Sequence, residues 1–206
     1  MSKLSNRAVV IIGFSIMILG FILITQDYFH GKKDKAYEKI SISLYQESQN
    51  GTIIDNTPKE VASADIAVSD NIKKGNYIGV LRIDKINLEQ GFYDKDNENN
   101  NVDKNVTLLG PSNYPNEKNG NTILVAHSGS SYLGYFKHLW KLQKGDVATI
   151  YYKNKTYLYK IVDIYTDKKD GDVTIYRNTK KTTLTLITCT KDSDTQQTIY
   201  IAELQE

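Results

Sequence analysis

The sequence predicts a mostly β domain, folded as a sandwich or a closed barrel and preceded by an apolar N-terminal helix. From residue 77 onward, the chain contains a series of short runs rich in β-branched and aromatic residues, several of which alternate with period two. Turn residues separate these runs, and only residues 135–143 suggest a short helical turn. Many short strands with little helix are typical of sandwiches and closed barrels.

The first element is an uncharged apolar run over residues 8–24, preceded by Lys3 and Arg7. As a helix rising about 1.5 Å per residue, this run nearly spans a hydrocarbon core of about 30 Å. Residues 25–29 lack the small side chains of a signal cleavage site, so we expect an uncleaved anchor over residues 1–25. Lysines directly after the run do not favour an N-terminus inside the cell. We expect the bulk of the chain outside because a short anchor before a large body suits that arrangement.

Residues 26–75 are predicted to form a stalk. Their first part, residues 33–50, is polar with Tyr37, Ile40 and Leu44 on one helical stripe. Residues 50–75 then become small and polar, which is typical of a flexible linker. The alternative is that this segment forms a piece of the folded domain.

The folded domain is expected over residues 76–206. Its predicted strands occupy residues 77–83, 86–94, 121–128, 146–152, 156–166, 183–190 and 198–204. The Asn-rich run over residues 96–101 is interpreted as a solvated loop.

Charge and cysteine content exclude several classes of function. The net charge is +2 with acids and bases interspersed, whereas a nucleic-acid-binding protein normally has a concentrated basic face. A single cysteine excludes an intramolecular disulfide. The histidines lack metal-ligand spacing, and no cofactor is expected. Two acidic loops, one with Asp94, Asp96 and Glu98 and one with Asp167, Asp170 and Asp172, leave open a weak Ca²⁺ site, although neither matches the twelve-residue calcium loop.

Cys189 is the candidate nucleophile, provided that an imidazole or cation stabilises its thiolate. An unperturbed thiol has a pKa of about 8.5, so only a few per cent is ionised at pH 7. His127 follows the apolar run 122–126, and Cys189 follows the apolar run 183–187. Two strand ends that each deliver one reactive side chain form a workable Cys/His pair, although a structural cysteine at a strand end is common. His30 beside the apolar run and His138 among apolar residues are interpreted as linker and packing residues.

Three segments resemble the sortase family of Gram-positive surface transpeptidases. Residues 183–189, TLTLITC, resemble the family's cysteine strand, and residues 124–128, LVAHS, resemble its catalytic-histidine strand. Residues 198–204, TIYIAEL, resemble the final strand. The order of the motifs and the separation of about 60 residues between His127 and Cys189 also agree. The resemblance covers roughly residues 76–206 and implies a closed eight-stranded β-barrel with short helices.

The resemblance also implies a reaction and its partners. Cys189 would attack a backbone carbonyl within an LPxTG-like sorting signal of a secreted protein. His127, as imidazolium beside the thiolate, would protonate the leaving amine. A cell-wall precursor peptide or a pilin lysine would then resolve the thioacyl-enzyme. Thr188 and Ser128, which adjoin the pair, are expected to contact the substrate.

One position departs from the family pattern. The family carries an arginine shortly before the last strand, where this chain has Gln197. Charged hydrogen bonds are roughly twice as strong as neutral ones, and loss of one oxyanion donor lowers the rate about 10²–10³-fold. Three explanations are open. Arg177 in the loop before the cysteine strand takes the place of the arginine; Arg82 does so, although its position in the first strand suits this less; or the enzyme is slow or specialised to another substrate. A simpler interpretation of Arg177 is an exposed loop charge. The alternative function is a sortase-fold surface protein that binds sorting signals or partners and turns over poorly.

Sortase class is predicted from what the sequence lacks. The stretch between residues 159–165 and 183–189 is too short for the helical insert of class B. No second apolar span lies at the C-terminus, and no Asp-Pro-aromatic lid motif precedes the barrel, which argues against class C. The prediction is therefore a class A-, D- or E-like enzyme.

Overall fold

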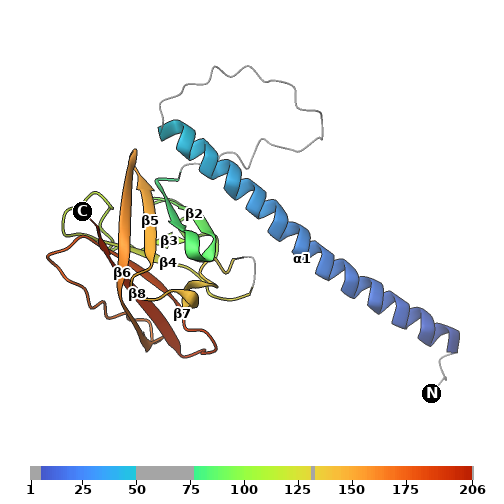
Figure 1. Ribbon diagram of the computed structural model, residues 1–206. Coiled ribbons are helices and arrows are strands. Elements are labelled where there is room, and N and C mark those ends of the chain that lie inside the picture. Colours follow the sequence, from blue (N-terminus) through green and yellow to red (C-terminus); the bar gives the residue numbers. More distant parts are fainter. Residues whose placement is uncertain (1–5, 50–76, 131–132, 206) are drawn as a thin grey trace, which may run out of the picture. The chain divides into compact units, whose positions relative to one another are not determined.

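A computed structural model describes residues 6–49, 77–130 and 133–205 (Figure 1). The chain divides into two compact units, residues 1–39 and residues 40–206. The predicted linker over residues 50–75 lies outside the described residues.

Helix α1 (Asn6–Gln49) is continuous over 44 residues and includes most of the predicted anchor and the first part of the predicted stalk. Among the residues that the structure describes, no helix reaches the combination of length and mean hydropathy that a membrane span requires. The anchor therefore remains a prediction from the sequence.

The last turns of α1 belong to the second compact unit. Ile42 and Tyr45 are buried in a cluster with Tyr77 and Val80. The Tyr45 hydroxyl donates a hydrogen bond of 3.0 Å to the backbone carbonyl of Ile78. Residues 40–49 therefore pack on the barrel, as the alternative interpretation of this segment expected.

Eight strands form one sheet that curls into a nearly closed barrel. They are β1 (Gly79–Ile83), β2 (Leu88–Phe92), β3 (Thr107–Leu108), β4 (Asn121–Val125), β5 (Val147–Tyr152), β6 (Lys155–Lys168), β7 (Thr183–Cys189) and β8 (Gln196–Leu204). Their order is β2-β1-β5-β6-β8-β7-β4-β3, and a bridge between Phe92 and Val106 brings the two edges together. The predicted eight-stranded barrel is confirmed, and the open alternative of a sandwich is wrong.

Two short 3₁₀ helices, η2 (Asp84–Ile86) and η3 (Leu139–Lys141), interrupt the strands. The second lies within the helical turn predicted over residues 135–143. Strand β3 was not predicted because two residues are too short to show a period.

Local chemistry explains how neighbouring strands are joined and bent. Lys153 and Asn154 both have positive φ, 46° and 59°, which forms the tight hairpin between β5 and β6. The pairing of β6 with β8 shifts register between Ile161 and Asp163. Such a bulge bends a strand and increases its twist, which lets a long strand follow a curved wall.

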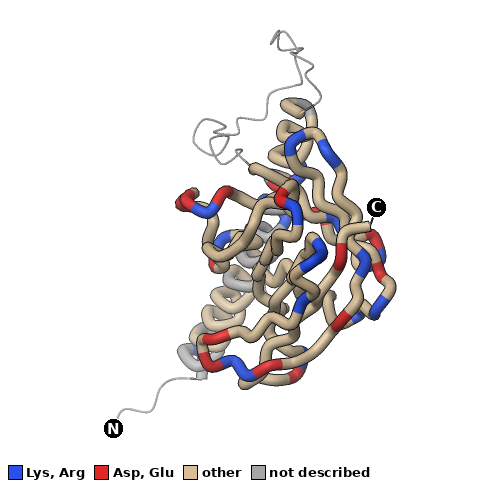
Figure 2. Tube along the Cα trace, turned by 90° about the vertical axis from the view of Figure 1, so that its left-hand side faces the viewer, with Lys and Arg blue, Asp and Glu red and all other residues tan. Residues whose placement is uncertain are grey.

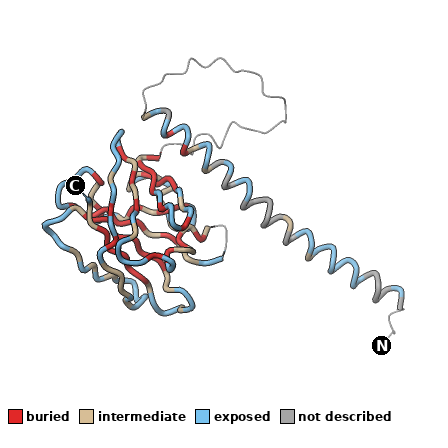
Figure 3. Tube along the Cα trace, in the orientation of Figure 1, coloured by how far each residue is buried: buried red, intermediate tan, exposed pale blue. Residues whose placement is uncertain are grey.

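The largest group of buried residues fills the barrel, and smaller buried clusters lie on the other face of β4, β7 and β8 and beneath the last turns of α1 (Figure 3). Strands β4 and β7 are buried along nearly their whole length, as is typical of neighbouring parallel strands covered on both faces. Basic and acidic residues are interspersed along the rest of the trace (Figure 2). The strands that carry the two candidate catalytic residues are therefore the most enclosed part of the fold.

Gly91 provides a test of the packing between β1, β2 and the last turns of α1. A Cβ added at Gly91 would overlap the Tyr77 ring, whereas a Cβ at Gly110 meets no atom within 4 Å. Overpacking typically costs about 1–3 kcal/mol. We expect Gly91→Ala to lower the free energy of unfolding by that amount in urea denaturation, and Gly110→Ala to leave it nearly unchanged. Equal effects of the two variants would contradict the close approach at Gly91.

Candidate active site

Cys189 is the last residue of β7 and the chain's free thiol. The preceding residues of the strand, Thr183 to Thr188, are all buried, but Cys189 is partly exposed. An inert structural cysteine is normally enclosed, whereas a reactive one needs access to substrate. The strand therefore brings its thiol to the surface at the point where regular pairing ends.

The parallel pairing of β4 with β7 places His127 beside Cys189. Asn121 lies opposite Thr183 and Val125 lies opposite Ile187. The regular pairing ends there, and the chain continues two residues further to His127 on one side and to Cys189, the last residue of β7, on the other. Neighbouring strands are about 4.8 Å apart, so the two residues arrive at adjoining positions. The two residues therefore emerge at the same end of the sheet, and both line one cleft.

Hydrogen bonds fix both strand ends directly at the site. The Thr188 hydroxyl donates a bond of 2.8 Å to the backbone carbonyl of Ala126. The Phe136 backbone N–H donates a bond of 2.9 Å to the carbonyl of His127. The residues next to the Cys/His pair are therefore held by specific bonds.

A cleft of about 660 Å³ opens at these strand ends. Its walls come from the end of β4, the β4–β5 connection, the end of β7, the β7–β8 loop and β8. The lining residues are His127, Ser128, Gly129, Phe136, Lys137, Trp140, Thr188, Cys189, Thr190, Lys191, Asp192, Ser193, Asp194, Thr198 and Tyr200. The four predicted residues His127, Ser128, Thr188 and Cys189 therefore line one cavity.

The charge of the cleft comes from lysines and aspartates of the surrounding loops. Lys191 lies with its ammonium 3.9 Å from the centroid of the Trp140 ring, within cation–π range. This contact joins the β7–β8 loop to η3. Burial raises the pKa of Tyr200, which also lines the cleft, to about 12.

Gln197 lies directly opposite Cys189 in the β7–β8 ladder, at the position predicted for the family arginine. Its side chain is nevertheless not among those that line the cleft. The Nε2 amide donates 2.9 Å hydrogen bonds to the backbone carbonyls of both Lys168 and Asp172. Because an amide nitrogen carries two protons, Gln197 can bond the last residue of β6 and the segment that follows it at the same time.

Arg177 lies at the opposite end of β7 from Cys189. Its guanidinium donates to the backbone carbonyls of Asn119, at 3.1 Å, and Lys181, at 3.4 Å, which precede β4 and β7. Arg82 in β1 pairs with Asp84 instead. Within the described part of the chain, no arginine lines the cleft.

His138 is part-exposed and directly precedes η3, and its side chain makes no capping hydrogen bond. Desolvation and the nearby Lys141 and Lys137 lower its pKa, so it is neutral at pH 7. It does not line the cleft, in agreement with its interpretation as a packing residue. The side chain of His30 lies outside the described residues.

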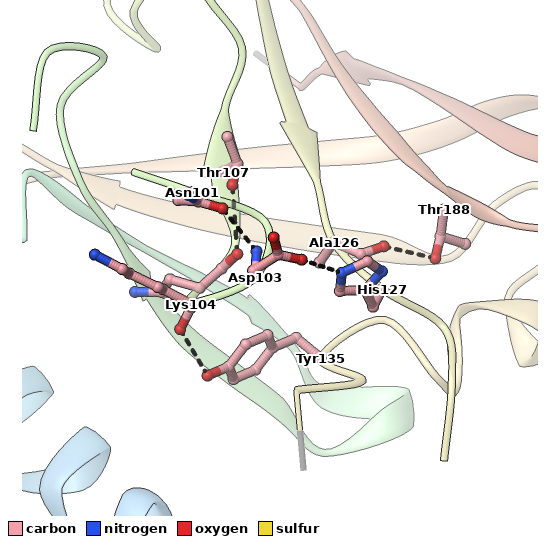
Figure 4. Close-up of polar contacts among 9 residues, drawn as sticks. Asn101, Asp103, Lys104, Thr107, Ala126, His127, Tyr135 and Thr188 are labelled. Carbon is pink, nitrogen blue, oxygen red and sulfur yellow. Dashed lines mark hydrogen bonds and ion pairs between the residues drawn. The ribbon is translucent and has the colours of Figure 1, made fainter. Parts of the chain in front are cut away.

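Asp103 is a residue of the site that the sequence did not reveal. Its Oδ1 lies 3.1 Å from His127 Nε2 (Figure 4). The residue follows the Asn-rich run of the loop, and no motif distinguishes it from the other acids of that segment.

Among the described residues, no group of three His, Cys, Asp or Glu side chains is arranged to hold a metal ion.

Comparison with known proteins agrees with the fold and the site. The sortase domain family matches residues 81–205. Sortase C1 from Streptococcus agalactiae is 30% identical with a TM-score of 0.54, over 65% of this chain and 69% of that chain. A sortase D5 transpeptidase from Clostridium perfringens is 19% identical with a TM-score of 0.57, over 84% and 98%. Sortase C from Streptococcus pneumoniae is 20% identical with a TM-score of 0.57, over 89% and 96%. No curated protein matches the chain.

A β-barrel that presents a thiol and an imidazole at adjoining strand ends defines an enzyme suited to acyl transfer through a thioester. The chain belongs to the sortase family and is a sortase-type cysteine transpeptidase. The finer prediction of class A, D or E is not confirmed by these comparisons, because the similar structures are mostly class C enzymes, with a sortase D5 and a sortase A beside them.

Gln197 provides a test of the site's architecture. Gln197→Ala removes the bonds to the end of β6 and to Asp172 in the segment after it, each worth about 1 kcal/mol or less. We expect hydrogen exchange of residues 169–175 to accelerate roughly three- to tenfold, while Gln196→Ala, which removes an exposed neighbour, leaves it unchanged. Unchanged exchange in Gln197→Ala would show that these bonds do not hold the segment.

Proposed function

We propose that this transpeptidase cleaves an LPxTG-like sorting signal of secreted proteins and joins the released acyl group to an amine. The observation that carries the proposal is the placement of His127 and Cys189 at adjoining ends of parallel strands in one cleft. The motifs at residues 124–128 and 183–189 support the choice of substrate, since they resemble those of the family.

The first step of the proposed reaction forms a thioester. The Cys189 sulfur, as thiolate, attacks the carbonyl carbon of the scissile peptide bond. The C–N bond breaks, and the leaving amine takes a proton from the His127 imidazolium. The products are a thioacyl-enzyme and the free C-terminal fragment of the substrate.

The second step reverses the roles of the two residues. An acceptor amine attacks the thioester carbon and loses a proton to His127, while the C–S bond breaks and the Cys189 thiolate leaves. The acceptor is a cell-wall precursor peptide or a pilin lysine. No net oxidation occurs, and the Cys/His pair returns to its starting state.

We infer that α1 anchors the enzyme at the cell membrane with the barrel outside. The inference is supported by the apolar run over residues 8–24 and by the exposure of large apolar side chains of α1, such as Phe14, Met17 and Phe21. An exposed apolar helix needs an apolar environment, which a bilayer supplies.

The sortase class remains part of the proposal. The connection over residues 169–182 contains no helix, which supports the exclusion of class B. Class A, D and E enzymes remain candidates from the sequence. Class C now joins them, because class C enzymes are prominent among the similar structures.

Removal of either catalytic residue tests the function. We expect Cys189→Ala and His127→Ala each to abolish the covalent adduct between the full-length chain and an LPxTG-type peptide, measured by intact mass. Ser193→Ala, which alters another residue of the cleft lining, should retain the adduct. An adduct that persists in Cys189→Ala would contradict the assignment of the nucleophile.

The absence of an arginine from the described cleft favours a second candidate, a sortase-fold module that binds sorting signals and turns over poorly. Under that account Gln197→Arg raises turnover sharply while peptide affinity changes little. Under the transpeptidase account wild type is already competent, and Gln197→Arg instead loosens the segment after β6. Steady-state turnover and peptide affinity of the two proteins distinguish the accounts.

A further inference from the structure

The geometry points to Asp103 as a positioning residue for His127, which fixes the imidazole in the tautomer that presents Nδ1 to Cys189. This inference rests on the proposed function, because it assigns His127 the proton transfers of that reaction. It adds a third side chain to the site, carried by the loop between β2 and β3. The starting observation is the 3.1 Å distance between Asp103 Oδ1 and His127 Nε2.

The chemistry of the two groups determines the direction of the hydrogen bond. An ionised carboxylate can only accept, so the bonded Nε2 must carry the proton. In a neutral imidazole the other nitrogen is then the acceptor, and the partner of one nitrogen thus decides the state of the other. In Figure 4 the second ring nitrogen lies on the side of the ring away from Asp103. Nδ1 is therefore the atom that exchanges protons with the thiol and the amines.

The loop that carries Asp103 is held in place by its own hydrogen bonds. The Asp103 backbone N–H donates a bond of 2.9 Å to Asn101 Oδ1. The side chain of Asn100 bonds at 2.9 Å to the carbonyl and at 2.8 Å to the N–H of Leu108. Asparagine amides thus replace backbone pairing in this loop, which explains its Asn-rich sequence.

A second contact docks the same loop on the same neighbour. The Tyr135 hydroxyl donates a bond of 3.2 Å to the backbone carbonyl of Lys104 (Figure 4). Tyr135 and His127 both belong to the segment that follows β4, and Phe136 binds the His127 carbonyl. The Asp103–His127 contact is therefore one of two adjacent attachments between these loops, which gives the carboxylate a defined position.

Exposure separates this positioning role from a structural one. The side chains of His127 and Asp103 are 42% and 78% exposed. Ion pairs at such exposure contribute little to global stability. Replacement of Asp103 should therefore change the rate of acylation without changing the unfolding transition.

The test compares Asp103→Asn, Asp103→Glu and Asp96→Asn in the full-length chain, with an LPxTG-type peptide as probe. Asp96 is an exposed acid of the same loop, so its variant makes the same change in charge away from His127. Asparagine can offer its N–H₂ to Nε2 and so favour the wrong tautomer. We expect Asp103→Asn to slow single-turnover acylation about tenfold or more, a share of the roughly 10²–10⁴-fold that acid–base catalysis supplies. Asp103→Glu should restore part of the rate, and Asp96→Asn should match wild type.

Nitrogen NMR of the labelled His127 ring supplies a readout that a merely structural role would not move. Wild type and Asp96→Asn should show a protonated Nε2 in the neutral ring, and Asp103→Asn should shift the population toward a protonated Nδ1. An acylation rate or a tautomer in Asp103→Asn equal to that in Asp96→Asn overturns the inference. If wild type itself forms no adduct, the proposed function fails, whereas the NMR comparison still reports on the contact with Asp103.

Discussion

Strands β4 and β7 pair in parallel, from Asn121 opposite Thr183 to Val125 opposite Ile187, and the site depends on this pairing. Parallel strands end on the same side, so the residues that follow them emerge together. His127 and Cys189 are those residues. A shift of one position in the register would turn one side chain to the other face of the sheet.

Several interactions protect that register. The two strands are buried along nearly their whole length, and the Thr188 hydroxyl bonds to the Ala126 carbonyl directly beside the pair. At the other end of the strands, the Asn121 amide oxygen accepts bonds of 3.0 and 2.9 Å from the hydroxyls of Thr183 and Thr185. Since buried polar groups are costly when unpaired, these bonds favour one alignment over a slipped one.

Residue patterns predicted the parts of the molecule that depend on continuous apolar strands. The ends of the runs before His127 and Cys189 located both candidate catalytic side chains, because buried strands have a clear composition. The sequence aligned Gln197 with the family arginine, but it did not show that Gln197 pairs with Cys189 or that its donors bind the carbonyls of Lys168 and Asp172. Arg177 precedes β7, and its bonds to the carbonyls of Asn119 and Lys181 hold it at the start of that strand, away from Cys189.

The loops carry the features that the sequence did not predict. Asp103 acts from an Asn-rich loop whose order comes from side-chain hydrogen bonds, and such bonds leave no periodic pattern. The contact between Lys191 and Trp140 joins two segments far apart in the chain. The docking of Ile42 and Tyr45 on the barrel likewise depends on partners beyond a long connection. Strands β4 and β7 therefore position His127 and Cys189, whereas contacts between segments far apart in the chain add the surrounding residues.

The most direct measurement of the central claim is disulfide formation in the His127→Cys variant. Because Cys189 is the chain's single cysteine, the variant contains one possible intramolecular pair. Adjoining positions on neighbouring strands fall near the Cα separation of about 4.4–6.8 Å that a disulfide needs. We predict that mild oxidation of the dilute protein forms this disulfide in His127→Cys, which lowers the intact mass by two hydrogens and leaves no titratable thiol. A His138→Cys control should keep its mass and both thiols. Two persistent free thiols in His127→Cys would contradict the juxtaposition of His127 and Cys189.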